Sequence, residues 1–359
     1  MKYPKLLFDL KKLKHNIDVV GGKTHQAGCS LMIVTKSLCA DPEVRKIADQ
    51  HPMVDYLADS RTLNLREMHD LTKPKVLLRI PQESELDDVV KFADISFQSE
   101  AITLAKTNEA AGKQGVIHKV VLMIDLGDLR EGIFFEDKKE IMDTARLIVD
   151  AANLELYGIG TNLTCYGAII PKEDNLSTLV GIAKEIENEL GIKLKMISGG
   201  NSSSYYLAEK SGLPEGINNL RLGESFFLGN DTAYGDKIKD TYNDAIVLKA
   251  QIVELKSKPS VPIGESGMDA FGNKPVYEDR GTIKRAIVAV GQQDTDPTGL
   301  QPLDSGIDIL GASSDHLILD VTKSETEYKV GDIVTFTLNF GSILRAVTSK
   351  YVNKEYLPE

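Results

Sequence analysis

The chain has 359 residues with a formal net charge of −11, and 42% of its residues are hydrophobic and 26% charged, which is typical of a globular protein of one large or two ordinary domains. The acidic balance and the lack of a basic patch argue against a nucleic-acid partner. No segment approaches the roughly 20 apolar residues that span a membrane. The N-terminus lacks a secretory signal, and three scattered cysteines fit neither a disulfide framework nor a zinc motif, so we expect a cytoplasmic protein.

The first two thirds of the chain alternate short apolar runs with amphipathic segments. A helix over residues 10–26 opens the series. Strands are expected at 31–35, 54–58, 75–80, 95–98, 119–125, 154–161, 194–198 and 220–222, and helices at 41–50, 61–71, 85–92, 100–111, 138–152, 174–190 and 202–210. This rhythm favours an α/β fold with a closed (β/α)8 barrel. An open, doubly wound sheet is the alternative, but it usually has a glycine-rich turn after its first strand, where this chain has Lys36.

The pattern changes near Ala245. Runs rich in β-branched residues, separated by Gly, Pro, Asp and Ser, follow one another without a helix until the segment "SILRAVTSKY". This pattern predicts a C-terminal, mostly antiparallel β domain. We therefore assign residues 1–240 to the barrel and 241–359 to the β domain, with the first residues of the chain able to join the β domain.

Lys36 follows the first predicted strand directly. In a (β/α)8 barrel the chemistry gathers where strands end, and phosphate sites favour the loops after strands seven and eight. A lysine amine at such a position can bond covalently to a phosphorylated aldehyde cofactor, and partial burial would lower its pKa. The alternative is a lysine that extends into solvent or pairs with Asp41.

Two motifs follow the last two predicted barrel strands. In "SGGNSSS", glycines and hydroxyls lead into a predicted helix, whose first backbone N–H groups would bind an anion. Taken alone, this motif is better explained by an ordinary helix N-cap with a tight turn. "RLGES" follows the eighth strand, and the two motifs together with Lys36 favour a phosphate-bearing cofactor.

Four motifs together resemble a known enzyme family. "IVTKSLCAD", "IDLGDLREG", "GGNSSS" and "LRLGESFFLG" are similar, in order and spacing, to the signatures of the fold-type III pyridoxal-phosphate enzymes, the alanine racemase group, and closest to its ornithine racemase-like branch. The resemblance runs along essentially the whole chain. It implies racemisation of a small amino-acid substrate, with a basic amino acid such as ornithine expected. It also implies a homodimer with shared active sites.

The resemblance also implies the residues that bind pyridoxal 5'-phosphate. Lys36 would hold the cofactor covalently, and Arg221 would face its pyridine nitrogen and keep that nitrogen unprotonated, which suits plain proton exchange at Cα. The remaining matches are phosphate contacts, namely Asn201, Ser202, the backbone at Gly223 and Glu224, and Tyr356. On the substrate side, Arg130 matches an arginine near the cofactor's phenolic oxygen and the substrate carboxylate, and Asp315 an aspartate that the partner subunit contributes.

Four positions depart from the family pattern. Ile263 stands where alanine racemases have the tyrosine that acts as second base, and Asn162 where they have its supporting histidine. Met123 replaces a carbamylated lysine beside Arg130, and Ala40 replaces a phosphate-contacting tyrosine. The cofactor site is therefore expected to be retained, whereas the second base must differ.

Racemisation needs a proton donor on the face opposite Lys36. Cys165 is one candidate, if nearby cations lower its pKa, and Glu265 and Asp269 are others. Cys165 could instead be a small packing residue, and the two acids could simply solvate a loop or bind a substrate ammonium group.

Two other functions fit the same fold. A metal-assisted aldolase or dehydratase would need His or Cys ligands in the β domain, where His316 is the only histidine. A non-catalytic cofactor-binding protein is the second alternative, although small proteins of that kind generally lack the C-terminal β domain.

Overall fold

The computed structural model describes residues 2–358, which form two compact units. One unit runs from Leu10 to Asn243. The other combines the residues up to Asp9 with the chain from Asp244 onward. None of the helices in the described residues is long and apolar enough to cross a membrane.

Eight parallel strands close into a barrel in the first unit. Their hydrogen bonds run in the order β5-β4-β3-β2-β10-β9-β8-β6, and β6 pairs with β5 to close the ring. The strands are β2 (Ser30–Val34), β3 (Tyr56–Asp59), β4 (Lys75–Leu77), β5 (Ile95–Gln98), β6 (His118–Asp125), β8 (Leu154–Gly160), β9 (Met196–Ser198) and β10 (Asn219–Leu222). The predicted barrel is therefore confirmed.

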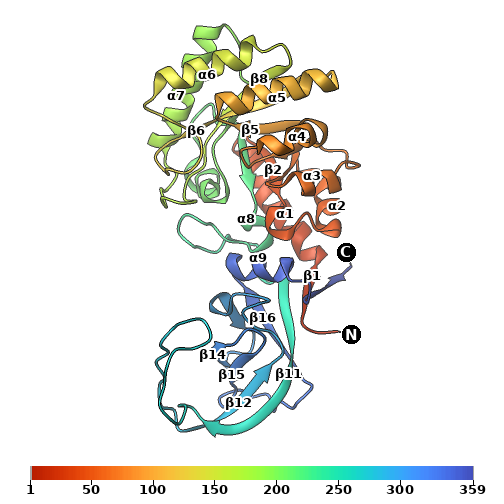
Figure 1. Cartoon of the computed structure of the whole chain (residues 1–359), viewed down its shortest axis with the longest axis vertical. Helices are drawn as coiled ribbons and strands as arrows, with labels where there is room; N and C mark the ends of the chain where they lie inside the picture. The colour runs from red at the N-terminus through yellow and green to blue at the C-terminus, as the bar shows by residue number, and fades with distance from the viewer. Residues whose placement is uncertain (1, 359) are drawn as a thin grey trace. The chain divides into compact units, whose positions relative to one another are not determined.

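Helices surround this barrel (Figure 1). They are α1 (Leu10–Gln26), α2 (Pro42–Gln50), α3 (Thr62–Glu67), α4 (Leu86–Phe92), α5 (Ala101–Gln114), α6 (Lys138–Asp150), α7 (Glu173–Leu190) and the single turn α8 (Glu224–Phe227). Short 3-10 turns cover Lys36–Leu38 and Glu83–Glu85, and the two-residue strand β7 (Ile133–Phe134) pairs with β6. Buried side chains from neighbouring strands, among them Met32, Phe97 and Met123, form an apolar core cluster.

Three predicted elements of the barrel differ from the structure. The strand expected at 75–80 ends at Leu77, and the helix expected at 61–71 ends at Glu67. The segment 202–210 is helical, as expected, but it is not one regular α-helix. A 3-10 turn, Ser202–Ser204, comes first and a π-helical turn, Leu207–Ser211, follows. Serine hydroxyls compete here for backbone partners, as when Ser204 Oγ donates to the Gly199 carbonyl at 2.7 Å.

The second unit is a mostly antiparallel sheet, as predicted. Its main path is β13-β16-β11-β12-β15-β14, and β1 pairs with both β11 and β17. The bounds are β1 (Lys5–Asp9), β11 (Ile246–Pro259), β12 (Thr282–Val288), β13 (Leu300–Pro302), β14 (Asp308–Ala312), β15 (Leu317–Asp320), β16 (Ile333–Leu338) and β17 (Asn353–Leu357), with a 3-10 turn at Pro297–Gly299 and the helix α9 (Phe340–Thr348). The N-terminal strand β1 thus lies in this sheet and pairs parallel with β17.

Candidate active site

Lys36 begins the turn that connects β2 to α2. The left-handed backbone of Cys39 (φ 52°) and Ala40 (φ 48°) ends this turn, and the Asp41 carboxylate then caps α2 by accepting from the backbone N–H groups of Glu43 and Val44. Because the Asp41 carboxylate caps α2, an ion pair between Asp41 and Lys36 is disfavoured as the role of Lys36. The Lys36 side chain remains open to solvent at the carboxyl end of β2.

Nearby groups shift the pKa of Lys36 in opposite directions. Desolvation by the surrounding protein lowers the pKa of the Lys36 amine, and the negative charge that Cys165 carries when ionised raises it. The Arg130 guanidinium lowers this pKa further, and the net shift is downward. Lys36, Arg130 and Cys165 therefore lie close enough for their charges to interact, and a larger share of the amine is uncharged near neutral pH than in an ordinary lysine.

Arg221 lies on β10 and is 2% exposed. Its guanidinium donates to Ser198 Oγ, to the Thr161 carbonyl at 2.5 Å and to Asn162 Oδ1 at 2.5 Å, and it stacks over the Phe97 ring at 5.0 Å. Burial lowers the pKa of Arg221 to about 10. Its fixed orientation gives the barrel mouth a rigid cationic donor.

Arg130 forms an ion pair with the residue that follows it, Glu131. Burial lowers the pKa of Arg130, but the hydrogen bonds and charge of Glu131 outweigh this effect, so the pKa is raised. Glu131 also accepts from Asn162 Nδ2 at 2.6 Å. Glu131 was not among the candidate residues predicted from the sequence. Its place beside Arg130 in "DLREG" was the one available signal.

Cys165 lies in the loop after β8, which a second missed residue, Asp128, holds in place. The fully buried Asp128 carboxylate accepts from the backbone N–H groups of Cys165 (3.1 Å), Tyr166 (2.9 Å) and Ile169 (3.3 Å). Asn201 Nδ2 donates to Cys165 Sγ at 3.2 Å. Burial raises the pKa of Cys165 more than Arg130 and Lys36 lower it, so the group is a thiol rather than a thiolate near neutral pH.

Hydrogen-bond donors converge where β9 and β10 end. The backbone N–H groups of Gly223 and Ser225 both donate to Ser202 Oγ at 3.2 Å. Ser225 Oγ is buried and has no hydrogen-bond partner. Glu224 is not part of this donor set through its side chain, since that side chain bonds to Asn230, and burial raises the pKa of the Glu224 carboxyl. Two backbone N–H groups and two hydroxyls thus gather at the ends of β9 and β10, and N–H groups at such a position can bind a phosphate group.

The remaining candidates lie in the β unit. Asp269 closes a turn by accepting from Phe271 N and Asn273 N, and these backbone hydrogen bonds lower the pKa of the Asp269 carboxyl. Asp315 accepts from the neighbouring Ser313 and Ser314 hydroxyls. Glu265 lies in the same exposed segment as Asp269. The ring of Tyr356, on β17, packs against Phe8.

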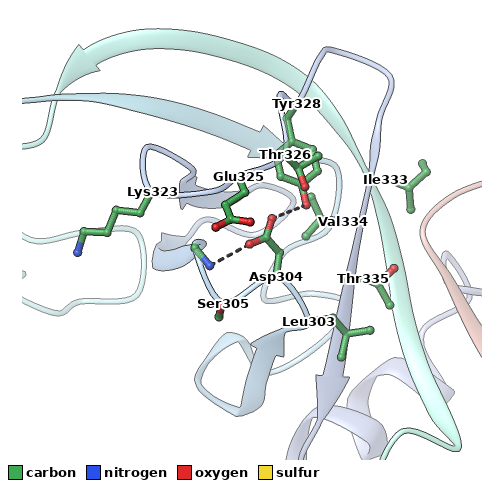
Figure 2. A pocket seen from close by; sticks show the side chains of 11 residues that line it. Leu303, Asp304, Ser305, Lys323, Glu325, Thr326, Tyr328, Ile333, Val334 and Thr335 are labelled. Carbon is green, nitrogen blue, oxygen red and sulfur yellow. Dashed lines mark hydrogen bonds between the residues drawn. The ribbon is translucent and has the colours of Figure 1, made fainter.

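A polar pocket of about 660 Å³ also lies in the β unit (Figure 2). Asp304 is at its centre and accepts from Tyr328 Oη at 3.1 Å and Ser324 Oγ at 2.6 Å (Figure 2 draws the Tyr328 bond). These bonds hold two loops together. Among residues 2–358, no group of three or more His, Cys, Asp or Glu side chains is arranged to hold a metal ion.

The barrel sequence matches a family model described as the N-terminal domain of alanine racemase, over residues 8–231. The chain belongs to the alanine racemase family. Racemases of this family depend on pyridoxal phosphate. The resemblance drawn from the four sequence motifs is thereby confirmed.

Similar proteins extend this family relationship to the full length of the chain. An ornithine racemase from Acetoanaerobium sticklandii is 53% identical and covers 99% of this chain and 100% of its own. A lysine racemase from Thermotoga maritima is 38% identical and covers 100% of this chain and 99% of its own. Among solved structures, alanine racemase from Clostridium difficile 630 has a TM-score of 0.74 at 21% identity, covering 99% of this chain and 96% of that one, which shows a shared fold.

Proposed function

We propose that this protein is a pyridoxal-phosphate-dependent racemase that interconverts the L and D forms of a basic amino acid such as ornithine by proton exchange at Cα. The observation that carries the proposal is the 53% identity, over both whole chains, to an ornithine racemase. The lysine racemase relative, also similar over its whole length, supports a basic substrate.

Pyridoxal 5'-phosphate fits the residues at the barrel mouth. Lys36 offers an accessible amine with a lowered pKa for the covalent bond. The donors around Ser202 and Gly223, including the unpartnered Ser225 hydroxyl, suit the phosphate, and Asn201 and the Glu224 backbone are proposed to contact it as well. The phosphate contact of Tyr356 stays a prediction from the family resemblance. The buried Arg221 suits the pyridine nitrogen. When bound, the cofactor withdraws electrons from Cα of the attached amino acid and so acidifies its proton.

Lys36 and Cys165 are the proposed proton carriers at Cα. An amine whose pKa is lowered can remove the proton from one face, and a thiol whose pKa is raised can donate from the other. Cys165 is close enough to interact electrostatically with both Lys36 and Arg130. Glu265 and Asp269 are the alternative proton carriers. The Asp269 carboxylate is already bonded within its own turn and its pKa is lowered, which disfavours that role for Asp269.

The substrate's charged groups have separate proposed partners. Arg130 would bind the α-carboxylate with the donors that Glu131 leaves available. The side-chain ammonium of ornithine or lysine would pair with an acid of the β domain, and Glu265, Asp269 and Asp315 are the proposed choices. These acids would come from a second copy of the chain, in a homodimer with shared active sites.

An exposed segment of the β unit supports this homodimer. In the segment 261–281, Ile263 is 90% exposed, Met268 80% and Val276 96%. Apolar side chains so fully exposed and so close in sequence are typical of a surface that a partner covers. We propose a second copy as that partner and, from the composition argument, a cytoplasmic location.

The direct test is to incubate the protein and pyridoxal phosphate with enantiopure L-ornithine and follow the D form by chiral chromatography. We expect racemisation of ornithine or lysine. We also expect Lys36→Ala to lose both racemisation and the visible absorbance of the bound cofactor, whereas the matched Lys138→Ala on α6 keeps both. Absence of racemisation with ornithine, lysine, alanine and serine, or aldehyde release from 3-hydroxy amino acids instead, would overturn the proposal.

A further inference from the structure

Arg221 is a buried cation without a charged partner of its own. It is 2% exposed, and its hydrogen-bond partners are a serine hydroxyl, a backbone carbonyl and the Asn162 amide oxygen, all of them neutral. A buried charge that is not balanced is costly. A negative charge that balances the Arg221 guanidinium therefore has to be connected to it through one of these three partners.

The Asn162 amide can connect Arg221 to a negative charge because it has both a hydrogen-bond donor and a hydrogen-bond acceptor. Its Oδ1 accepts from Arg221 Nη2 at 2.5 Å, while its Nδ2 donates to Glu131 Oε1 at 2.6 Å. A guanidinium can only donate and an ionised carboxylate can only accept, so these two neighbours fix the orientation of the amide.

Glu131 serves two arginines at once. Its Oε1 accepts from Arg130 Nη2 at 2.5 Å as well as from Asn162, and its Oε2 accepts from Arg130 Nε. This bidentate contact uses the side of the Arg130 guanidinium that includes Nε. The end formed by Nη1 and Nη2 still has donors to offer.

We propose that Glu131 is a positioning residue that aligns Arg130 for the substrate carboxylate and, through Asn162, balances the buried charge of Arg221. The side chains Arg221, Asn162, Glu131 and Arg130 thus form one relay, which connects the cofactor side of the site to the substrate side. The inference rests on the proposed function for the roles of the two arginines, but the relay itself is a property of the protein.

The relay can be tested with neither cofactor nor substrate. We expect Glu131→Gln and Asn162→Ala each to lower the urea midpoint of unfolding, and the double variant to lose clearly less than the sum of the two, because both cut the same connection. Glu136→Gln, which alters an exposed acid farther along the same segment, is the matched control and should leave the midpoint unchanged. If the loss in urea midpoint of the double variant equals the sum of the two single losses, the relay is overturned.

The functional consequence is tested in the loaded enzyme. Glu131→Gln keeps the shape of the side chain but places an amide N–H₂ against the donors of Arg130. We therefore expect KM for ornithine to rise about tenfold, which corresponds to about 1.4 kcal/mol of binding free energy, with a much smaller change in kcat. Asn162→Ala should leave KM near that of wild type, because the Arg130–Glu131 pair remains.

Both variants should shift the pH at which the visible absorbance of the bound cofactor changes, since each alters the charge balance at Arg221. KM for ornithine should rise less in Glu131→Asp than in Glu131→Gln. An unchanged KM and titration in Glu131→Gln would overturn the positioning role. If wild type racemised none of ornithine, lysine, alanine and serine, the proposed function would fail, while the unfolding cycle would still decide the relay.

Discussion

At the scale of single residues, burial acts oppositely on the two proposed proton carriers. It lowers the pKa of the Lys36 amine and raises the pKa of the Cys165 thiol, because desolvation disfavours the charged form of each. From its sequence, Cys165 was a candidate proton donor on the condition that nearby cations lower its pKa. Arg130 and Lys36 do act in that direction, but burial outweighs them. Cys165 is therefore suited first to donating a proton.

Deuterium exchange tests Cys165 as the acid of one face. In D₂O, we expect the racemisation rate of Cys165→Ala to be at least about a hundredfold below that of wild type, in line with the contribution of a general acid–base group. One enantiomer of ornithine should still exchange its Cα hydrogen, with retention of configuration, because Lys36 continues to serve the other face. NMR of the Cα position measures this exchange.

Cys29→Ala is the matched control, since Cys29 is a buried cysteine at the start of β2 whose pKa burial raises to about 12. It should racemise like wild type. Undiminished racemisation in Cys165→Ala would assign the second face to another group.

At the scale of elements, tight contacts between neighbouring strands decide where the barrel accepts a side chain. A Cβ added at Gly158, on β8, would lie 2.0 Å from the backbone carbonyl oxygen of Met196 on β9. That oxygen belongs to a strand and cannot turn away as a side chain could. Gly158 is thus needed for close approach of the strands and not for a turn.

Gly158→Ala should destabilise the protein by about 2 kcal/mol, the typical cost of forcing extra atoms into a packed core. Gly181, in the middle of α7, is the matched control, because an added Cβ there meets nothing within 4 Å. Gly181→Ala should stabilise the protein by about 0.5–1 kcal/mol, since alanine favours the helix. Urea unfolding monitored by circular dichroism compares the two, and equal midpoints would contradict the packing argument.

Local pattern predicted most barrel elements because apolar periodicity repeats along each strand and helix. The helix over 10–26 has the predicted bounds. The pattern did not indicate β13 and β17, which are short strands whose hydrogen-bond partners are distant in sequence. It also did not indicate β14, a short strand whose pairing with the next strand, β15, is interrupted by a register shift. It also could not foresee the 3-10 and π turns after Asn201, where side-chain hydroxyls take over backbone hydrogen bonds.

At the scale of the whole molecule, the exposed segment 261–281 leads to a prediction about assembly. Ile263→Glu combined with Val276→Glu should convert a dimer to a monomer in sedimentation velocity, because two buried charges would oppose an apolar interface. Racemase activity should fall with the dimer if the active sites are shared. Val330→Glu, at an exposed turn of the same unit, is the control and should remain dimeric.

A wild-type monomer at micromolar concentration that racemises fully would rule out the shared site. A double variant that remains dimeric would place the interface elsewhere on the chain.

The sequence by itself determined the barrel, the β domain and the family, because periodicity and four ordered motifs are local properties of the chain. It also selected Lys36, Arg130 and Arg221 as candidates. Only the tertiary structure decided how they are connected. The hydrogen bonds from Asn162 to Glu131 and from Arg221 to Asn162 join residues 31 and 59 positions apart. Such contacts depend on the closure and register of the barrel strands, which bring the ends of distant segments together, and no local pattern encodes them.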